Sequence, residues 1–89
     1  MKFEEFVKQL NCDYNLESFD NKKIIRIHQI KKIEIDGIKI QIPHDMAFYF
    51  ENDILTSSIM PENFEIDINQ LKNSQYFKIE NNELIRKKI

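Results

Sequence analysis

Apolar and polar residues alternate along much of the chain, most regularly between residues 33 and 42. The five isoleucines there occupy odd positions before Asp36-Gly37 and even positions after it. A period of two is typical of a strand with one buried face. Asp-Gly favours the two-residue loop of a type I′ hairpin, which would place all five isoleucines on one face. The alternative is one bent strand with a bulge at Gly37, the only glycine of the chain.

The hairpin is the preferred interpretation, because Asp-Gly adopts the positive φ angles of such a loop at little cost. It also fixes the register of the two strands and places opposite charges across from each other on the polar face. The predicted pairs are Ile35 with Ile38, Ile33 with Ile40, and Glu34 with Lys39.

Residues 1–11 show a different period and predict the only helix. Phe3, Phe6, Val7 and Leu10 follow the i, i+3, i+4, i+7 spacing of one apolar helix face, with charged residues between them. A helix of about three turns is not stable alone, so we expect this face to pack on a sheet.

From residue 14 to residue 89 we expect short strands and no second helix. Pairs and triplets of Asn, Asp and Pro with turn-forming character separate the strands, a spacing typical of an antiparallel meander. The expected strands span residues 15–19, 23–29, 32–35, 38–42, 46–51, 54–60, 64–68, 75–80 and 83–88.

Three similar segments indicate an internal repeat of hairpin units, with spacings of 31 and 29 residues. They are Phe19-Asp20-Asn21, Phe50-Glu51-Asn52 and Ile79-Glu80-Asn81. We read about two and a half copies of one unit. The alternative is chance similarity among hairpins built from few residue types. The predicted fold is mainly β (α+β), a single domain over 1–89. Its N-terminal helix (1–11) precedes an antiparallel meander (14–89) that forms one curved sheet or a small barrel.

The composition limits the kinds of protein to which this chain can belong. A chain of 89 residues with 42% hydrophobic and 31% charged residues suits one small globular domain. No apolar run is long enough to cross a bilayer, and the N-terminus lacks the apolar core of a signal peptide. The single cysteine, Cys12, favours a reducing compartment, so we expect a cytoplasmic protein. Isoleucine, lysine and asparagine, whose codons are A/T-rich, supply 36 residues and indicate a low-GC bacterium or its phage.

The sequence contains no convincing catalytic or metal-binding motif. A nucleophile needs a base and an orienting group, and neither candidate set here has a supporting local motif. Cysteine and histidine side chains are too few and too far apart for a structural zinc site, and one glycine excludes phosphate-binding loops. We therefore expect no enzyme activity, no cofactor and no metal. The candidate sets are Cys12 with His44 and Asp45, and Ser57-Ser58 with His28.

Charge falls into four blocks. The net charges are −3 for residues 1–21, +4 for 22–44, −6 for 45–67 and +3 for 68–89. If neighbouring strands pair, acidic and basic strips would alternate across the sheet. The alternative is that the blocks pair with and solvate one another.

We expect the acidic block to bind a partner, because its 23 residues hold six acids and no base. In a meander, five of these acids could lie on one surface, where their fields would add and attract a basic protein. The expected binding residues are Glu51, Asp53, Glu62, Glu65 and Asp67.

The competing hypothesis assigns single-stranded nucleic acid to the basic residues, with Tyr76 and Phe77 as a stacking face. The net charge of −2 and the presence of only two arginines argue against it. The residues concerned are Lys22, Lys23, Arg26, Arg86, Lys87 and Lys88.

Together these patterns favour a non-enzymatic protein-binding module. The favoured hypothesis is a small inhibitor encoded by a phage or mobile element, anti-defence or anti-CRISPR-like, that blocks a larger partner. The alternatives are a bacterial hairpin-repeat or immunity-type interaction protein and a small β domain that binds single-stranded nucleic acid. We expect a protein partner, no membrane, and a homodimer through a sheet edge as one arrangement open to the chain.

Overall fold

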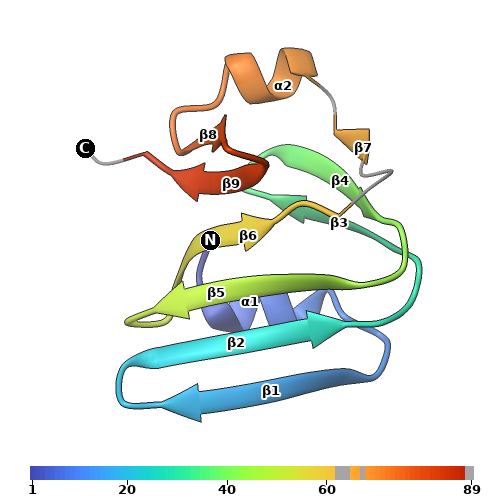
Figure 1. Ribbon diagram of the computed structural model, residues 1–89, viewed down its shortest axis with the longest axis vertical. Coiled ribbons are helices and arrows are strands. Elements are labelled where there is room, and N and C mark those ends of the chain that lie inside the picture. Colours follow the sequence, from blue (N-terminus) through green and yellow to red (C-terminus); the bar gives the residue numbers. More distant parts are fainter. Residues whose placement is uncertain (62–64, 67, 88–89) are drawn as a thin grey trace.

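The structure is a computed structural model that describes residues 1–61, 65–66 and 68–87. Within these residues the chain forms two short helices and nine strands (Figure 1). The elements are α1 (Phe3–Lys8), β1 (Tyr14–Phe19), β2 (Lys22–Ile27), β3 (Lys31–Ile35), β4 (Ile38–Ile42), β5 (Met46–Glu51), β6 (Ile54–Ile59), β7 (Glu65–Ile66), α2 (Ile68–Lys72), β8 (Phe77–Glu80) and β9 (Glu83–Arg86).

The strands form two open antiparallel sheets. The larger has the order β1-β2-β5-β6-β9-β8 and consists of three hairpins side by side, whereas the smaller has the order β3-β4-β7. In the chain, β3 and β7 each follow one of these hairpins, and in the small sheet they flank β4. The mainly-β class, the N-terminal helix and the hairpins are confirmed. The single sheet or barrel is replaced by two sheets, because the chain leaves the larger sheet after β2 and again after β6.

The predicted hairpin at Asp36-Gly37 is confirmed in register and in loop conformation. Asp36 has a φ of 46° and Gly37 a φ of 88°, the two positive angles of a type I′ loop. This excludes a bulge within one strand. The pairs are Ile35 with Ile38, Ile33 with Ile40, and Glu34 with Lys39.

Asparagine and aspartate take the role of glycine in the other two-residue loops. Asn52 and Asp53 have φ angles of 52° and 62°, and Asn81 and Asn82 have 51° and 61°. These two residue types tolerate the left-handed region best among residues other than glycine. In the β1–β2 loop only Asp20 has a positive φ, 53°. Asp20 lies in its loop whereas Glu51 and Glu80 end a strand, so the first of the three similar segments is one residue out of step.

One hydrophobic core fills the space between the two sheets and α1. The Phe6 ring, fully buried, lies 4.7 Å from the Phe48 ring and 5.3 Å from the Phe50 ring, measured between centroids. The helix predicted over residues 1–11 is shorter than expected, because α1 covers only Phe3–Lys8. Its apolar face packs as predicted: Phe6 is buried, Phe3 and Val7 pack against the core, and Leu10 is buried just after the helix. The core also contains all five hairpin isoleucines, namely Ile33, Ile35, Ile38, Ile40 and Ile42.

The expectation of no second helix is wrong. Residues Ile68–Lys72 form α2, and β7 covers only Glu65–Ile66 of the expected strand over 64–68. A helix this short is held by tertiary contacts rather than by propensity, and Leu71 packs against the core.

The loop conformation predicts a contrast between two substitutions of Gly37. A Cβ added there would meet nothing within 4 Å, so only the positive φ opposes a side chain. Gly37→Val should lower the free energy of unfolding by about 1–3 kcal/mol, and Gly37→Asn by clearly less. Urea denaturation of both variants measures this difference. Equal losses would show that Gly37 does not need the left-handed region.

Candidate functional site

Four of the charged residues singled out in the sequence, Lys22, Lys23, Glu51 and Asp53, lie at one end of the large sheet. The β1–β2 and β5–β6 loops lie side by side, because the backbone N–H of Asn52 donates to the Asn21 carbonyl at 2.8 Å. The Asn21 side-chain amide also donates to the Asn52 side-chain oxygen at 3.1 Å. These bonds hold the loop after the acidic residue Glu51 of β5 beside the loop before the basic strand β2.

Each predicted nucleic-acid-binding cation of β2 lies beside a carboxylate. The Lys23 ammonium lies 2.6 Å from an Asp53 carboxylate oxygen and 4.3 Å from the centroid of the Phe3 ring. Lys22 is the cross-strand partner of Glu51. The Arg26 guanidinium approaches Glu17 at 3.9 Å. These charges therefore compensate one another locally and form neither a basic nor an acidic strip.

The expectation that five acids follow one meander is wrong. Glu51 and Asp53 lie in the β5–β6 hairpin of the large sheet, whereas the backbone of Glu65 pairs with Gln41 of β4 in the small sheet. The reason is that β7 pairs with β4 instead of β6. Glu62 and Asp67 lie outside the described residues, and a binding role for any of the five acids stays a prediction.

The C-terminal basic residues lie apart from those of β2. Arg86 ends β9, and the strands β5 and β6 separate β9 from β2. The Lys87 ammonium donates to the Ser74 carbonyl at 2.7 Å, and Lys88 lies outside the described residues. Of the two predicted stacking residues, Tyr76 is exposed, but Phe77 is fully buried and offers no ring face to a base.

The outer face of the large sheet carries an apolar row that the sequence analysis missed. The cross-strand pairs place Ile24, Tyr49 and Ile85 in one line, with Ser57 of β6 between Tyr49 and Ile85. Their side chains are half-buried. In Figure 1, α1 lies behind β2 and β5, on the opposite face, where Phe6 packs. Strand alternation in β2, β5 and β9 could have indicated this row, but only once the strand order was known.

Exposed apolar side chains and shallow hollows extend this row. Phe19 is 51% exposed and Ile59 is 48% exposed. One hollow of about 250 Å³ is lined by Phe19, Ile24 and Tyr49 among others. A second hollow of about 760 Å³ is lined by Glu51, Thr56, Ser57, Glu83, Ile85, Arg86 and Lys87. The outer face is therefore apolar along its middle and charged around it.

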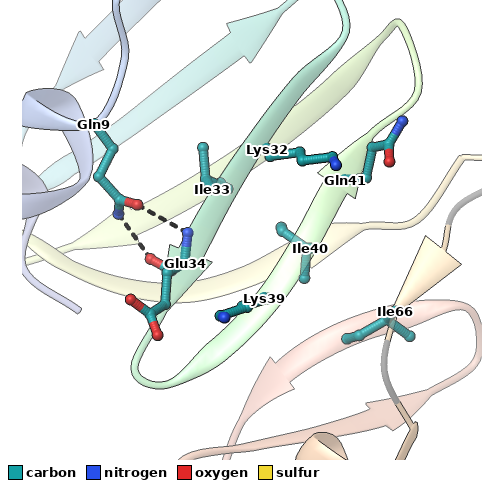
Figure 2. A pocket seen from close by; sticks show the side chains of 8 residues that line it. All are labelled: Gln9, Lys32, Ile33, Glu34, Lys39, Ile40, Gln41 and Ile66. Atoms are coloured by element: carbon teal, nitrogen blue, oxygen red, sulfur yellow. Dashed lines mark hydrogen bonds between the residues drawn. The ribbon is translucent and has the colours of Figure 1, made fainter.

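The small sheet bears a groove of about 630 Å³ with a mixed polar and apolar lining, shown in Figure 2. The Gln9 side-chain amide lies at its end. It donates to the Glu34 carbonyl at 2.7 Å and accepts from the Glu34 N–H at 2.8 Å. Lys32, Lys39 and Gln41 line the rest together with apolar atoms of the sheet. This groove therefore mixes both signs of charge with apolar surface.

Members of the two candidate nucleophile sets considered in the sequence analysis make other contacts. Asp45 bonds to His28, with 2.5 Å between Oδ1 and Nδ1, and the other ring nitrogen lies 3.1 Å from the Asn15 amide nitrogen. The Ser58 hydroxyl is buried and donates to the Ala47 carbonyl. Among residues 1–61, 65–66 and 68–87, no three His, Cys, Asp or Glu side chains cluster so that they could hold a metal.

Neither helix in the described part of the chain has the length and apolar character needed to cross a membrane. Comparison with protein-family models, with curated proteins and with solved structures finds no match. Any function must therefore be inferred from the surfaces of this chain.

The compensated charges of β2 predict weak binding of single-stranded nucleic acid. Exchanging the three neighbouring carboxylates for amides, in the combined variant Glu17→Gln, Glu51→Gln and Asp53→Asn, would leave the cations uncompensated. We expect the wild type not to bind a labelled oligothymidine at physiological salt, and the variant to bind it in a salt-dependent manner. Fluorescence anisotropy measures both.

The matched control removes the same amount of negative charge elsewhere, through Glu4→Gln, Glu5→Gln and Glu34→Gln, three exposed acids with no ion pair among the described residues. It should bind no better than the wild type. Tight binding by the wild type that is lost on changing Lys22, Lys23 and Arg26 to Ala would contradict the local compensation.

Proposed function

We propose that this chain is a non-enzymatic protein-binding module whose contact surface is the outer face of the large sheet. The observation that supports the proposal is the row of Ile24, Tyr49 and Ile85 across the middle of that face. An antiparallel sheet that leaves one face to water normally alternates, with polar residues on the outside. An apolar centre within a polar rim is instead the composition of a protein interface.

The chemistry of this face defines the partner it suits. Tyr49 stands at the centre of the row, and tyrosine is enriched among the residues that dominate binding energy. The rim carries both signs of charge, with Lys22 and Arg26 on β2, Glu51 on β5 and Glu83 on β9. The matching partner surface has an apolar centre and mixed charges at its margin, rather than the uniformly basic surface that an acidic strip would require.

The finer proposal is that binding blocks the partner, as a small inhibitor from a phage or mobile element does. It is supported by the small size of the chain and by its Ile-, Lys- and Asn-rich composition. The alternative is a bacterial hairpin-repeat or immunity-type module that binds its partner without abolishing the partner's activity. An activity assay of the purified partner with added module distinguishes the two, because only an inhibitor lowers that activity.

Site-specific photo-crosslinking tests the contact surface. A photoreactive phenylalanine analogue replaces Tyr49 in one variant and Lys39, on the polar face of the small sheet, in the control variant. We expect one host protein to crosslink in good yield from position 49 and not from position 39. Adding Ile24→Lys to the position-49 variant should reduce that yield at least about tenfold, since a charge in the apolar centre costs more than about 1.4 kcal/mol.

Crosslinking that is equal from both positions, or stronger from position 39, would contradict the assignment to the outer face. Circular dichroism of each variant confirms that the fold is retained. The Ile24→Lys change should leave the fold intact, because this side chain is only half-buried and lies outside the core.

A further inference from the structure

Two open sheets have four edges, and in the small sheet side chains bond to backbone groups that strand pairing leaves free. At the edge of β3, the Gln9 side-chain amide hydrogen-bonds to both the N–H and the C=O of Glu34, as Figure 2 shows. On the other side β7 is only two residues long, and beyond it the Gln70 side-chain oxygen accepts the backbone N–H of Lys39 at 3.0 Å. Unpaired backbone groups on an edge strand can pair with a strand of another chain, and backbone groups already bonded to a side chain cannot.

The β8 edge of the large sheet is also obstructed. The Ser74 hydroxyl accepts the backbone N–H of Phe77 at 3.2 Å. The strand is only four residues long and carries the exposed charges of Lys78 and Glu80. Short length and charge are the usual protections of an edge strand.

The β1 edge has no such protection in the described part of the chain. The two-residue loop makes Phe19 and Lys22 a hydrogen-bonded pair, so the backbone groups of Tyr14, Leu16 and Ser18 point away from β2. By the same alternation, the backbone N–H and C=O of Glu34 point away from β4, and there they bond to the Gln9 side chain. No described group bonds to the outward backbone of β1.

The side chains of β1 also do not prevent pairing with another strand. The strand has six residues in continuous register with β2, without proline, lysine or a bulge. Its one charge, Glu17, faces Arg26 within the same sheet. Leu16 lies on the core-side face but is 47% exposed.

We propose that β1 pairs antiparallel with β1 of a second copy of this chain, about a two-fold axis at Leu16. In this register Leu16 faces Leu16 of the second copy and Tyr14 faces Ser18, so all three outward backbone positions form pairs. The two large sheets become one continuous sheet. The exposed Leu16 side chains meet each other across the axis.

The charges of β1 favour this register, and they favour a second copy of the chain as the partner strand. On the other face, Asn15 lies opposite Glu17 of the second copy, where its amide donates to the carboxylate. Outward backbone groups recur every second residue, so the nearest alternatives are shifts by two residues. One shift places Glu17 opposite Glu17 and the other places Glu17 opposite Asp13, and both are repulsive. The pairing is isologous and closes at two copies, because the β8 edge that a filament would need is obstructed.

Sedimentation analysis of the intact chain tests the dimer. Pairing of one six-residue strand buries little surface, so the expected affinity is weak, and concentrations up to about 1 mM must be covered. We expect a reversible monomer–dimer equilibrium. Leu16→Lys should abolish it by placing two like charges on the axis. Ile79→Lys, an equal change at an exposed isoleucine of the β8 edge, should leave it unchanged.

Disulfide crosslinking tests the register, in a background that carries Cys12→Ala. Leu16→Cys should crosslink to itself on oxidation, because facing residues of a hydrogen-bonded pair lie about 5.5 Å apart between Cα atoms. Ser18→Cys should not, since Ser18 faces Tyr14. A chain that stays monomeric over the whole range overturns the proposal, as does dimerisation that Leu16→Lys leaves intact. A crosslink from position 18 but not 16 overturns the register.

Discussion

The structure depends on the need to pair the backbone groups at the edges of two small sheets. An unpaired backbone N–H or C=O away from water is costly, and one in water offers a site for another strand. A barrel removes its edges by closing, but neither sheet here closes. The chain instead uses side-chain amides and a hydroxyl. Gln9 and Ser74 each bond to an edge strand, and Gln70 bonds to the part of β4 that β7 does not pair with. This local solution leaves the edge of β1 open.

Charge compensation follows from the strand order. The chain leaves the large sheet after β2 and returns as β5, so the basic strand β2 becomes the neighbour of the hairpin that carries Glu51 and Asp53. Lys23 then binds Asp53, and Lys22 lies opposite Glu51. Exposed pairs of this kind add little stability, but they remove the long-range field that either block would have alone. Recognition by the outer face therefore rests on the apolar row around Tyr49 more than on net charge.

Sequence patterns sufficed for local structure. The change of parity at Asp36-Gly37 fixed the hairpin register, and alternation located every strand to within a few residues. The distribution of strands between two sheets could not be read in this way, because pairs such as β2 with β5 join residues about 25 apart and depend on which inner faces pack together. The helix α2 could not be recognised from the sequence, since its five residues span little more than one turn and show no repeated apolar spacing.

The site was less predictable than the fold for the same reason. The acidic and basic sets were chosen by their place in the chain, and tertiary pairing interleaved them. The bonds of Gln9 to Glu34 have no sequence signature, because a glutamine just after a short helix is equally compatible with solvent. The row of Ile24, Tyr49 and Ile85 joins three strands that are distant in sequence, so it emerges only from the registers.

The central claim is that β1 is the open edge while β3 is closed by a side chain. Amide hydrogen exchange measured by NMR at low and high protein concentration tests it most directly. The account predicts that the Leu16 amide exchanges fast in dilute solution and becomes protected as concentration rises, while the Glu34 amide is protected at both. A Leu16 amide that is already protected in dilute solution, or a Glu34 amide that exchanges as fast as an unstructured one, would contradict it.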